Sequence, residues 1–417
     1  MRARLEEKVQ SAADAVFGGA PRCSECGRAM KSRGRRCASF LSRFGEVTVR
    51  GSRWRCRRCP AQHASVLQLL GAEAGRTSGS LARLLALLGV VVPYELAARL
   101  AYVFFGVEVN AMTVWRAVQR LGRACEQYVE EQARFCRDPQ GAPTGRGPGP
   151  AAVLLGVDGS MLGMQVHPHR RRNDGDRPLP PLPAVEDGHF REVKTGVLLL
   201  PAERVEPTPG RRSVVRRALV TCLGEADAVF DRLWAKLHEL GWLGEQTVAV
   251  IIGDGAEWIW NRASMFPRRC EILDFWHAVE KAWEFARLRW GEESKRAASW
   301  AHRLADDLRG GRVTEVIARL EALPARTGEE GELLEGLIRY YTENRSRMHY
   351  DEYLRKGYGI GSGAVESAHK QVVQARMRQA GMRWSEAGAQ RLLALRVLLL
   401  NDQWSMLDRL TMKPLAA

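Results

Sequence analysis

The sequence predicts an α/β core that is interrupted by a helical block and preceded by a cysteine-rich module and a pair of helices. Two apolar runs each end in Asp-Gly, residues 281–355 are almost continuously helical in pattern, and two C-x-x-C pairs occur within the first 60 residues. The chain has 417 residues. Because a domain averages roughly 100 to 200 residues, we expect about three units.

The charge of the chain is positive and unevenly distributed. The formal net charge is +15, and residues 1–63 contain 15 Lys or Arg against 5 acids. Residues 355–396 contain 8 Lys or Arg against 2 acids, so these two segments account for the excess. Such a balance indicates a polyanionic partner such as nucleic acid and predicts two basic faces.

Nothing in the sequence suggests export or a membrane span. The first residues are charged rather than apolar, and we expect a cytoplasmic protein that does not bind membranes. The apolar run 81–92 contains Arg83 and ends before Pro93, whereas a span needs about 20 apolar residues. We therefore expect a buried helix there. Nine cysteines, an odd number, argue against a disulfide framework and leave metal binding or burial.

Residues 1–65 resemble a zinc-ribbon-like DNA-binding module. Two C-x-x-C turns supply four thiolates for a structural Zn²⁺, with Cys37 and His63 as substitute ligands and four unrelated thiols as the alternative. The segment between the turns alternates like a hairpin around Gly51 and Ser52. Arginines surround the second turn and suit phosphate contacts. The predicted zinc ligands are Cys23, Cys26, Cys56 and Cys59, and the predicted DNA contacts are Arg53, Arg55, Arg57 and Arg58.

Residues 80–136 predict a helix-turn-helix region. A helix from Pro93 ends at Gly106, and Asn110 is placed to cap a second helix. In that second helix the apolar positions form one face and leave Arg116 and Arg120 on others, where they can enter a major groove. The alternative is a basic surface helix in a helical bundle.

The α/β core is predicted to begin after a Pro- and Gly-rich linker at 137–150. Its first part, 151–280, contains apolar strands that end at Asp158, at Asp254 and at Asp274. An all-α insertion follows at 281–357. Residues 358–417 form the last part of the core and include a helix that carries Glu366.

Glu366 is the only acid in the cationic segment 358–385. One interpretation is a surface pair with Lys370, worth a few tenths of a kcal/mol. The other is a carboxylate cluster with Asp158 and Asp254, able to hold two divalent ions about 4 Å apart for phosphodiester chemistry. Each aspartate, taken alone, has a helix-cap alternative. The residues expected to hold DNA beside the cluster are Lys370, Arg376, Arg378, Arg383 and Trp384.

Six motifs together resemble the DDE transposases of bacterial insertion sequences, most closely the ISKra group. They are "VDGSM", "REVKTGVLL", "GDGAEWIW", "DFWHAVE", "GIGSGAVESAHK" and "RMRQAGMRWS", and they cover residues 151–400. The resemblance implies an RNase H-like catalytic core with the helical insertion and two Mg²⁺ (or Mn²⁺) ions per active site. It implies Asp158, Asp254 and Glu366 as catalytic metal ligands, with Asp274 and His277 as supporting residues.

The implied function is a DNA transposase that binds the ends of an insertion sequence, cleaves them and joins their 3′ hydroxyls to target DNA. We expect a homodimer or larger oligomer on DNA, associated with a bacterial nucleoid. The alternatives are a domesticated, non-catalytic DNA-binding regulator and a metal-dependent nuclease without strand transfer. The polar loop 167–187 departs from the family pattern; contact with DNA is one interpretation of its arginines, and its role stays open.

Overall fold

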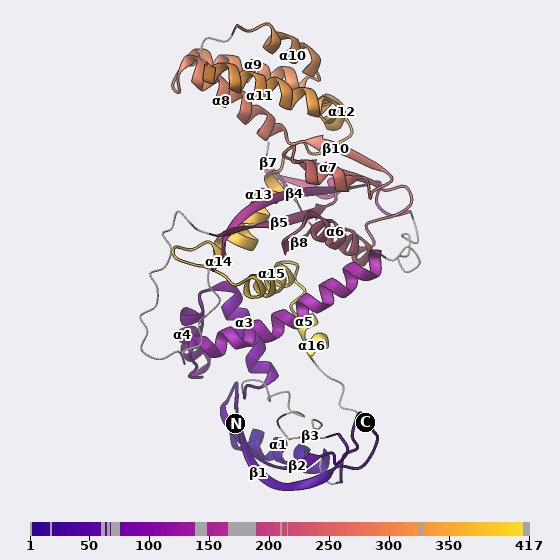
Figure 1. Ribbon diagram of the computed structural model, residues 1–417, viewed down its shortest axis with the longest axis vertical. Helices are drawn as coiled ribbons and strands as arrows, with labels where there is room; N and C mark the ends of the chain where they lie inside the picture. Colours follow the sequence, from indigo (N-terminus) through magenta and orange to yellow (C-terminus); the bar gives the residue numbers. More distant parts are fainter. Residues whose placement is uncertain are drawn as a thin grey trace. The chain divides into compact units, whose positions relative to one another are not determined.

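The computed structural model describes residues 2–16, 19–59, 63–64, 67, 76–137, 148–165, 189–208, 211–214, 216–324 and 328–411 (Figure 1). They form two compact units, Met1–Tyr128 with Ala387–Ala417, and Val129–Glu386. The prediction assigned 358–417 to the α/β core, whereas the structure groups the end of that segment with the N-terminal unit. The loop 167–187 and residues 138–147 of the predicted linker lie outside the described residues.

The first unit begins with a helix and a three-stranded sheet. Its elements are α1 (Arg2–Val16), β1 (Lys31–Ser42), β2 (Gly45–Arg55) and β3 (His63–Ala64), and the strand order is β1-β2-β3. Helix α1 packs on one face of the hairpin through a small core of Ala13, Phe40, Val47 and Val49.

The hairpin turn differs from the prediction. Ser42 pairs with Gly45, which has a φ of 96°, so the chain reverses there. Gly51 pairs with Arg36 and Ser52 with Arg35, which places the predicted turn in the middle of β2. Sequence alternation indicated the hairpin but not its register, because the same alternation fits either turn.

The rest of the first unit is mainly helical, with α3 (Gly79–Val91), α4 (Tyr94–Phe105), α15 (Glu386–Leu400) from Ala387 onward, α16 (Met406–Thr411) and the part of α5 (Ala111–Arg137) up to Tyr128. The predicted helix boundaries are confirmed: α4 ends at Gly106, whose φ is 64°, and Asn110 Oδ1 accepts from the Thr113 backbone N–H at 2.9 Å. Helix α15 approaches α5 closely, since a Cβ at Gly122 would lie 2.8 Å from the Arg391 carbonyl oxygen.

The predicted apolar run 81–92 forms most of α3, and Leu81, Leu85 and Val90 are buried. Among the described helices, none combines the length and apolar character needed to cross a bilayer. The expectation of a buried helix is therefore confirmed.

The second unit is built on a five-stranded mixed sheet of order β10-β9-β4-β5-β8. Strands β4, β5 and β8 are antiparallel neighbours, whereas β9 runs parallel to both β4 and β10. The α/β prediction is therefore confirmed. The strand bounds are β4 (Ala152–Gly163), β5 (Phe190–Leu199), β8 (Arg217–Leu223), β9 (Val248–Gly253) and β10 (Arg269–Leu273), with β6 (Arg204–Thr208) and β7 (Arg211–Val214) as a separate pair.

Each face of this sheet has its own apolar core. Alternate strand residues such as Val153 and Leu155 pack with α6 (Ala226–Leu240) and α7 (Glu257–Ala263). Others, such as Leu154 and Ile252, belong to a core that continues into a block of five helices (Figure 1). These helices are α8 (Phe275–Trp290), α9 (Lys295–Arg309), α10 (Val313–Glu321), α11 (Gly328–Asn344) and α12 (Tyr350–Arg355). The described part of the predicted insertion 281–357 contains no strand.

The second unit ends with the segment that carries Glu366. It forms α13 (Gly363–His369), a π-helical turn over Lys370–Gln374 and α14 (Ala375–Met377). A Cβ at Gly156 of β4 would lie 3.3 Å from Val365 Cβ, so α13 rests directly on the central strand.

Candidate active site and cysteine cluster

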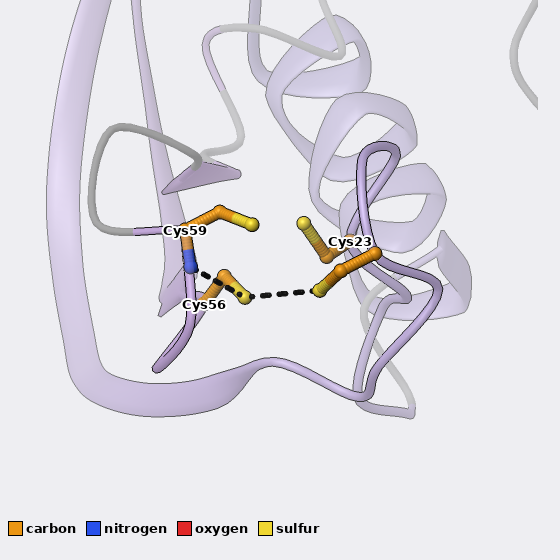
Figure 2. A group of neighbouring side chains, drawn as sticks. Cys23, Cys56 and Cys59 are labelled. Atoms are coloured by element: carbon orange, nitrogen blue, oxygen red, sulfur yellow. Dashed lines mark hydrogen bonds between the residues drawn. The ribbon is translucent and has the colours of Figure 1, made fainter.

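The four predicted cysteines converge in the first unit. The ligand atoms of Cys23, Cys26, Cys56 and Cys59 all lie within 4.8 Å of one another, and Figure 2 shows three of these side chains pointing to a common centre. Cys26 Sγ and Cys56 Sγ are 3.5 Å apart. Tetrahedral zinc with Zn–S bonds of about 2.3 Å would separate the sulfurs by about 3.8 Å. The cluster could therefore bind a metal such as zinc.

Backbone contacts prepare this cluster for a metal. The Cys59 backbone N–H donates to Cys56 Sγ at 3.3 Å. Together with smaller contributions from the Arg58 backbone and the Cys26 and Cys23 thiols, this contact lowers the pKa of Cys56 to about 7 against the opposing effect of burial. Gly27, with a φ of 65°, closes the first turn by donating to the Cys23 carbonyl. Cys37, the predicted substitute ligand, is exposed on β1 and outside the cluster. His63 begins β3, and its side chain lies outside the described part of the structure.

Asp158 and Asp254 lie just beyond the paired part of the parallel strands β4 and β9, Asp158 within β4 and Asp254 directly after β9. Gly156 pairs with Ile252 across β4 and β9, and the two aspartates follow two residues later on each chain. Asp158 is not at the end of its strand as predicted, because β5 continues the ladder by pairing Thr195 with Asp158 and Phe190 with Gly163. Asp158 lies in the part of β4 that β9 no longer pairs with.

Burial and the neighbouring charged groups shift the pKa of Asp158 in opposite directions. Burial raises the pKa of the Asp158 carboxyl, and the charge of Asp254 raises it further, whereas His369, the Gly159 N–H and His277 lower it. Asp254 Oδ1 accepts from the Ala256 N–H at 3.0 Å, the turn contact expected of an aspartate before a helix. Asp254 is thus both a turn residue before α7 and a charged neighbour of Asp158, and the one role does not exclude the other.

Glu366 is connected to the sheet through a serine. It is exposed on α13, directly after the buried Val365. Ser362 Oγ lies 3.1 Å from Glu366 Oε1 and also donates to Asp274 Oδ2 in a short hydrogen bond. The sequence contained Ser362 in its "GSG" motif, but no pattern identified it as a link between two carboxylates.

The buried Asp274 and the partly exposed His277 form an acid–imidazole pair beside these residues. Asp274 caps α8 by accepting from the Trp276 N–H at 2.9 Å, and its Oδ2 is 3.1 Å from His277 Nδ1. Burial raises the pKa of Asp274, but the hydrogen bonds from His277, Ser362 and Trp276 outweigh burial and lower it overall. The hydrogen bond to Asp274 raises the pKa of His277 to about 9, so this ring is protonated at neutral pH.

Two further residues near the acids were not predicted as site residues. His369 Nε2 lies 3.6 Å from Asp158 Oδ2, and burial lowers the pKa of this imidazole. Tyr340 donates its hydroxyl to the Asp254 carbonyl at 2.7 Å, and burial, Asp254 and Asp274 raise its pKa. Tyr340 comes from the helical block, so no local sequence pattern could have assigned it to a strand end.

The predicted DNA-contacting residues divide into exposed and buried groups. Arg376 and Trp384 are buried, at 1% and 9% exposure, and the guanidinium stacks 5.4 Å from the indole centroid. The prediction that both face DNA is therefore wrong. The prediction for Arg376 assumed a regular α-helix, whereas the π-helical turn adds a residue and rotates the following side chains. The prediction for Trp384 depended only on the arginines around it in the sequence. The exposed members of the predicted set are Lys370, Arg378, Arg383, Arg53, Arg55, Arg57, Arg58 and Arg116.

Arg120 differs from Arg116 on the same helix. Burial lowers the pKa of Arg120, whereas Arg116 is exposed. Gln119 is also buried and accepts from Arg391 Nη1 at 2.9 Å. This side of α5 packs within its own unit, as the bundle alternative expected, and Arg116 is the better placed of the two predicted arginines for an external partner.

The carboxylates do not form one close metal cluster. Among the described residues, the four cysteines are the only group of three or more His, Cys, Asp or Glu whose ligand atoms all lie within 4.8 Å of one another. The chain matches no protein-family model and no curated protein. Fold and site define a mixed α/β protein with a four-cysteine cluster and with acidic and histidine side chains gathered around one edge of its central sheet.

Proposed function

We propose that this chain is a DDE-type DNA transposase with an RNase H-like core, in which Asp158, Asp254 and Glu366 bind two Mg²⁺ or Mn²⁺ ions. The observation that carries the proposal is the register of β4 and β9, whose last pair, Gly156 with Ile252, comes two residues before Asp158 and two residues before Asp254. Glu366 follows the residue that packs α13 onto β4. The three acids are 96 and 112 residues apart along the chain, and three antiparallel strands followed by two parallel ones suit such a core.

The donor set fits the proposed ions, because Mg²⁺ prefers carboxylate oxygens. When bound, a metal pair supplies a nucleophilic water at neutral pH and stabilises the leaving 3′ oxygen of an in-line displacement. Burial raises the pKa of Asp158, and Asp254 raises it further, whereas His369 and the Gly159 N–H lower it. A bound cation would favour the charged carboxylate. Ser362 contacts both Glu366 and Asp274, and Asp274 follows β10, the neighbour of β9.

Two cationic side chains beside the acids, His277 and Lys370, are suited to binding the phosphates of DNA. His277 carries a proton on Nδ1 toward Asp274, and its side chain is 40% exposed. The opposite edge of the ring is therefore available to donate a hydrogen bond to a phosphate oxygen. Lys370, exposed one turn after Glu366, extends this positive surface along the path of a DNA backbone.

The experiment uses the purified full chain, Mg²⁺ and labelled duplexes taken from the DNA that flanks the coding region. We expect cleavage that leaves a 3′ hydroxyl, followed by joining of that end to a plasmid target. Cleavage without joined product would favour a nuclease, and neither product with intact DNA binding would favour the non-catalytic regulator. A duplex of shuffled sequence is the control for recognition of the ends.

A further inference from the structure

The hairpin of the first unit contains a stretch that its own helix does not cover. Helix α1 contacts the hairpin through Val47 and Val49, and the Gln10 side chain reaches Arg50 by hydrogen bonds to its backbone N–H and carbonyl. Residues 31–37 of β1, beyond this point, are all exposed. In the sheet order β1-β2-β3, β1 is an edge strand.

This uncovered stretch is strongly cationic. Residues 28–59 contain 11 Lys or Arg and a single acid, Glu46, which pairs with Leu41 near the turn at the other end of the hairpin. We call residues 31–37 and 50–55 the arginine ribbon; within it Gly51 is buried, Trp54 packs beside the cysteine cluster, and Trp54 and Arg55 also pair with β3. Its cations are Lys31, Arg33, Arg35, Arg36, Arg50, Arg53 and Arg55, all of them exposed.

The cations lie on both faces of the ribbon. Successive side chains of a strand point to opposite faces, so Arg35, opposite Ser52, and Arg36, opposite Gly51, project in opposite directions. A protein that rests on the outside of a DNA backbone needs positive charge on one face. Edge protection against aggregation needs only one or two charges. A ribbon that is positive on both faces suits a position with phosphates on both sides, which is a groove.

We propose that the arginine ribbon inserts into the major groove of duplex DNA, between its two phosphate backbones. The major groove is about 12 Å wide and admits a two-stranded β-ribbon, which β1 and β2 form up to the point where β3 pairs with Trp54 and Arg55; the minor groove is only about 6 Å wide. The exposed Arg57 and Arg58 in the second cysteine turn continue the positive surface from the base of the ribbon. This surface would be the DNA-binding surface of the proposed transposase. The inference rests on the proposed function in one respect, that DNA is the polyanion which the protein binds.

The test compares two full-length variants that each lose three positive charges. The ribbon variant carries Arg33→Gln, Arg35→Gln and Arg36→Gln, and the control carries Lys295→Gln, Arg296→Gln and Arg303→Gln on exposed positions of α9. Binding to a random 20-base-pair duplex is measured between 50 and 200 mM salt. For the ribbon variant we expect the slope of log affinity against log salt to fall by about three. The control should keep the parent slope, and equal zinc content shows that the cysteine module remains folded.

A second comparison identifies the groove. Parent protein is titrated with a duplex in which glucosylated hydroxymethylcytosine fills the major groove, and with an A-form RNA duplex, whose major groove is too deep and narrow for side chains to read. We expect at least tenfold weaker binding to both than to unmodified DNA. Equal binding to all three, or an unchanged slope in the ribbon variant, would overturn the proposal. Asp158→Asn protein should give the same binding results, so a failure of catalysis leaves this test intact.

Discussion

The Ser362 hydroxyl lies 3.1 Å from the Glu366 carboxylate, four residues further along the chain. The same hydroxyl donates to Asp274, and because it carries one proton it can donate to only one carboxylate at a time. We predict that Ser362→Ala lowers the DNA cleavage rate by about 10- to 100-fold, the usual effect of losing a group that orients a metal ligand. The Mg²⁺ concentration for half-maximal rate should rise, and Ser362→Thr should restore most activity. Parent kinetics in Ser362→Ala would contradict this role.

The His277–Asp274 pair makes the stability of the second unit depend on pH. His277 has a folded pKa of about 9 against an ordinary value of 6.5, so the folded state holds its proton more tightly than the unfolded chain. This contribution is fully present below pH 6.5 and is lost as pH rises toward 9. An NMR titration of the ring should show the raised pKa, and Asp274→Asn should return it toward 6.5. An unchanged titration in Asp274→Asn would show that another group holds the proton.

The cysteine cluster predicts one zinc per chain. Cys56→Ser should abolish stoichiometric zinc, because three remaining thiolates cannot complete the tetrahedral site, and should unfold the segment around β1 and β2. Cys37→Ser is the matched control, since Cys37 is exposed and outside the cluster. Metal analysis of the two purified variants checks the prediction. Equal zinc content in both would show that the four cysteines do not bind it.

Trp384 is predicted to stabilise the fold and not to contact DNA. Its Nε1 donates to the Met377 carbonyl at 2.9 Å, and its ring stacks on the buried Arg376. Trp384→Ala should cost about 3–5 kcal/mol of unfolding free energy, as large core truncations do. Trp276→Ala is the control, because Trp276 is 57% exposed and its removal should change stability little. Chemical denaturation measures both, and a Trp384→Ala protein of parent stability would contradict the packing role.

Local signals predicted much of this structure. The αL glycine after α4 and the Asn110 cap of α5 each depend on a few neighbouring residues, so the sequence was sufficient for them. The position of Asp158 within β4 depends on how far β5 continues to pair, which is a long-range property. The burial of Arg376 depends on the π-helical turn before it, for which the sequence offered no signal. Tyr340 reaches Asp254 across 86 residues.

The three proposed catalytic acids should behave as one unit. Asp158→Asn and Glu366→Gln should each reduce cleavage by several orders of magnitude, and the double variant should be little worse than either single one, because residues that share a function are strongly non-additive. Rates of single-turnover cleavage in Mg²⁺ measure this. Reductions that multiply in the double variant would indicate that the two residues act independently.

The most direct test of the proposed function is the cleavage rate of Glu366→Gln protein on end DNA in Mg²⁺, measured together with its DNA affinity. The substitution keeps the size of the side chain and removes its charge, while the exposed Lys370, Arg378 and Arg383 remain. We predict that DNA binding persists or tightens and that cleavage falls by several orders of magnitude. A Glu366→Gln protein that cleaves at close to the parent rate would contradict the catalytic assignment, because Glu366 would then be only a surface partner of nearby cations.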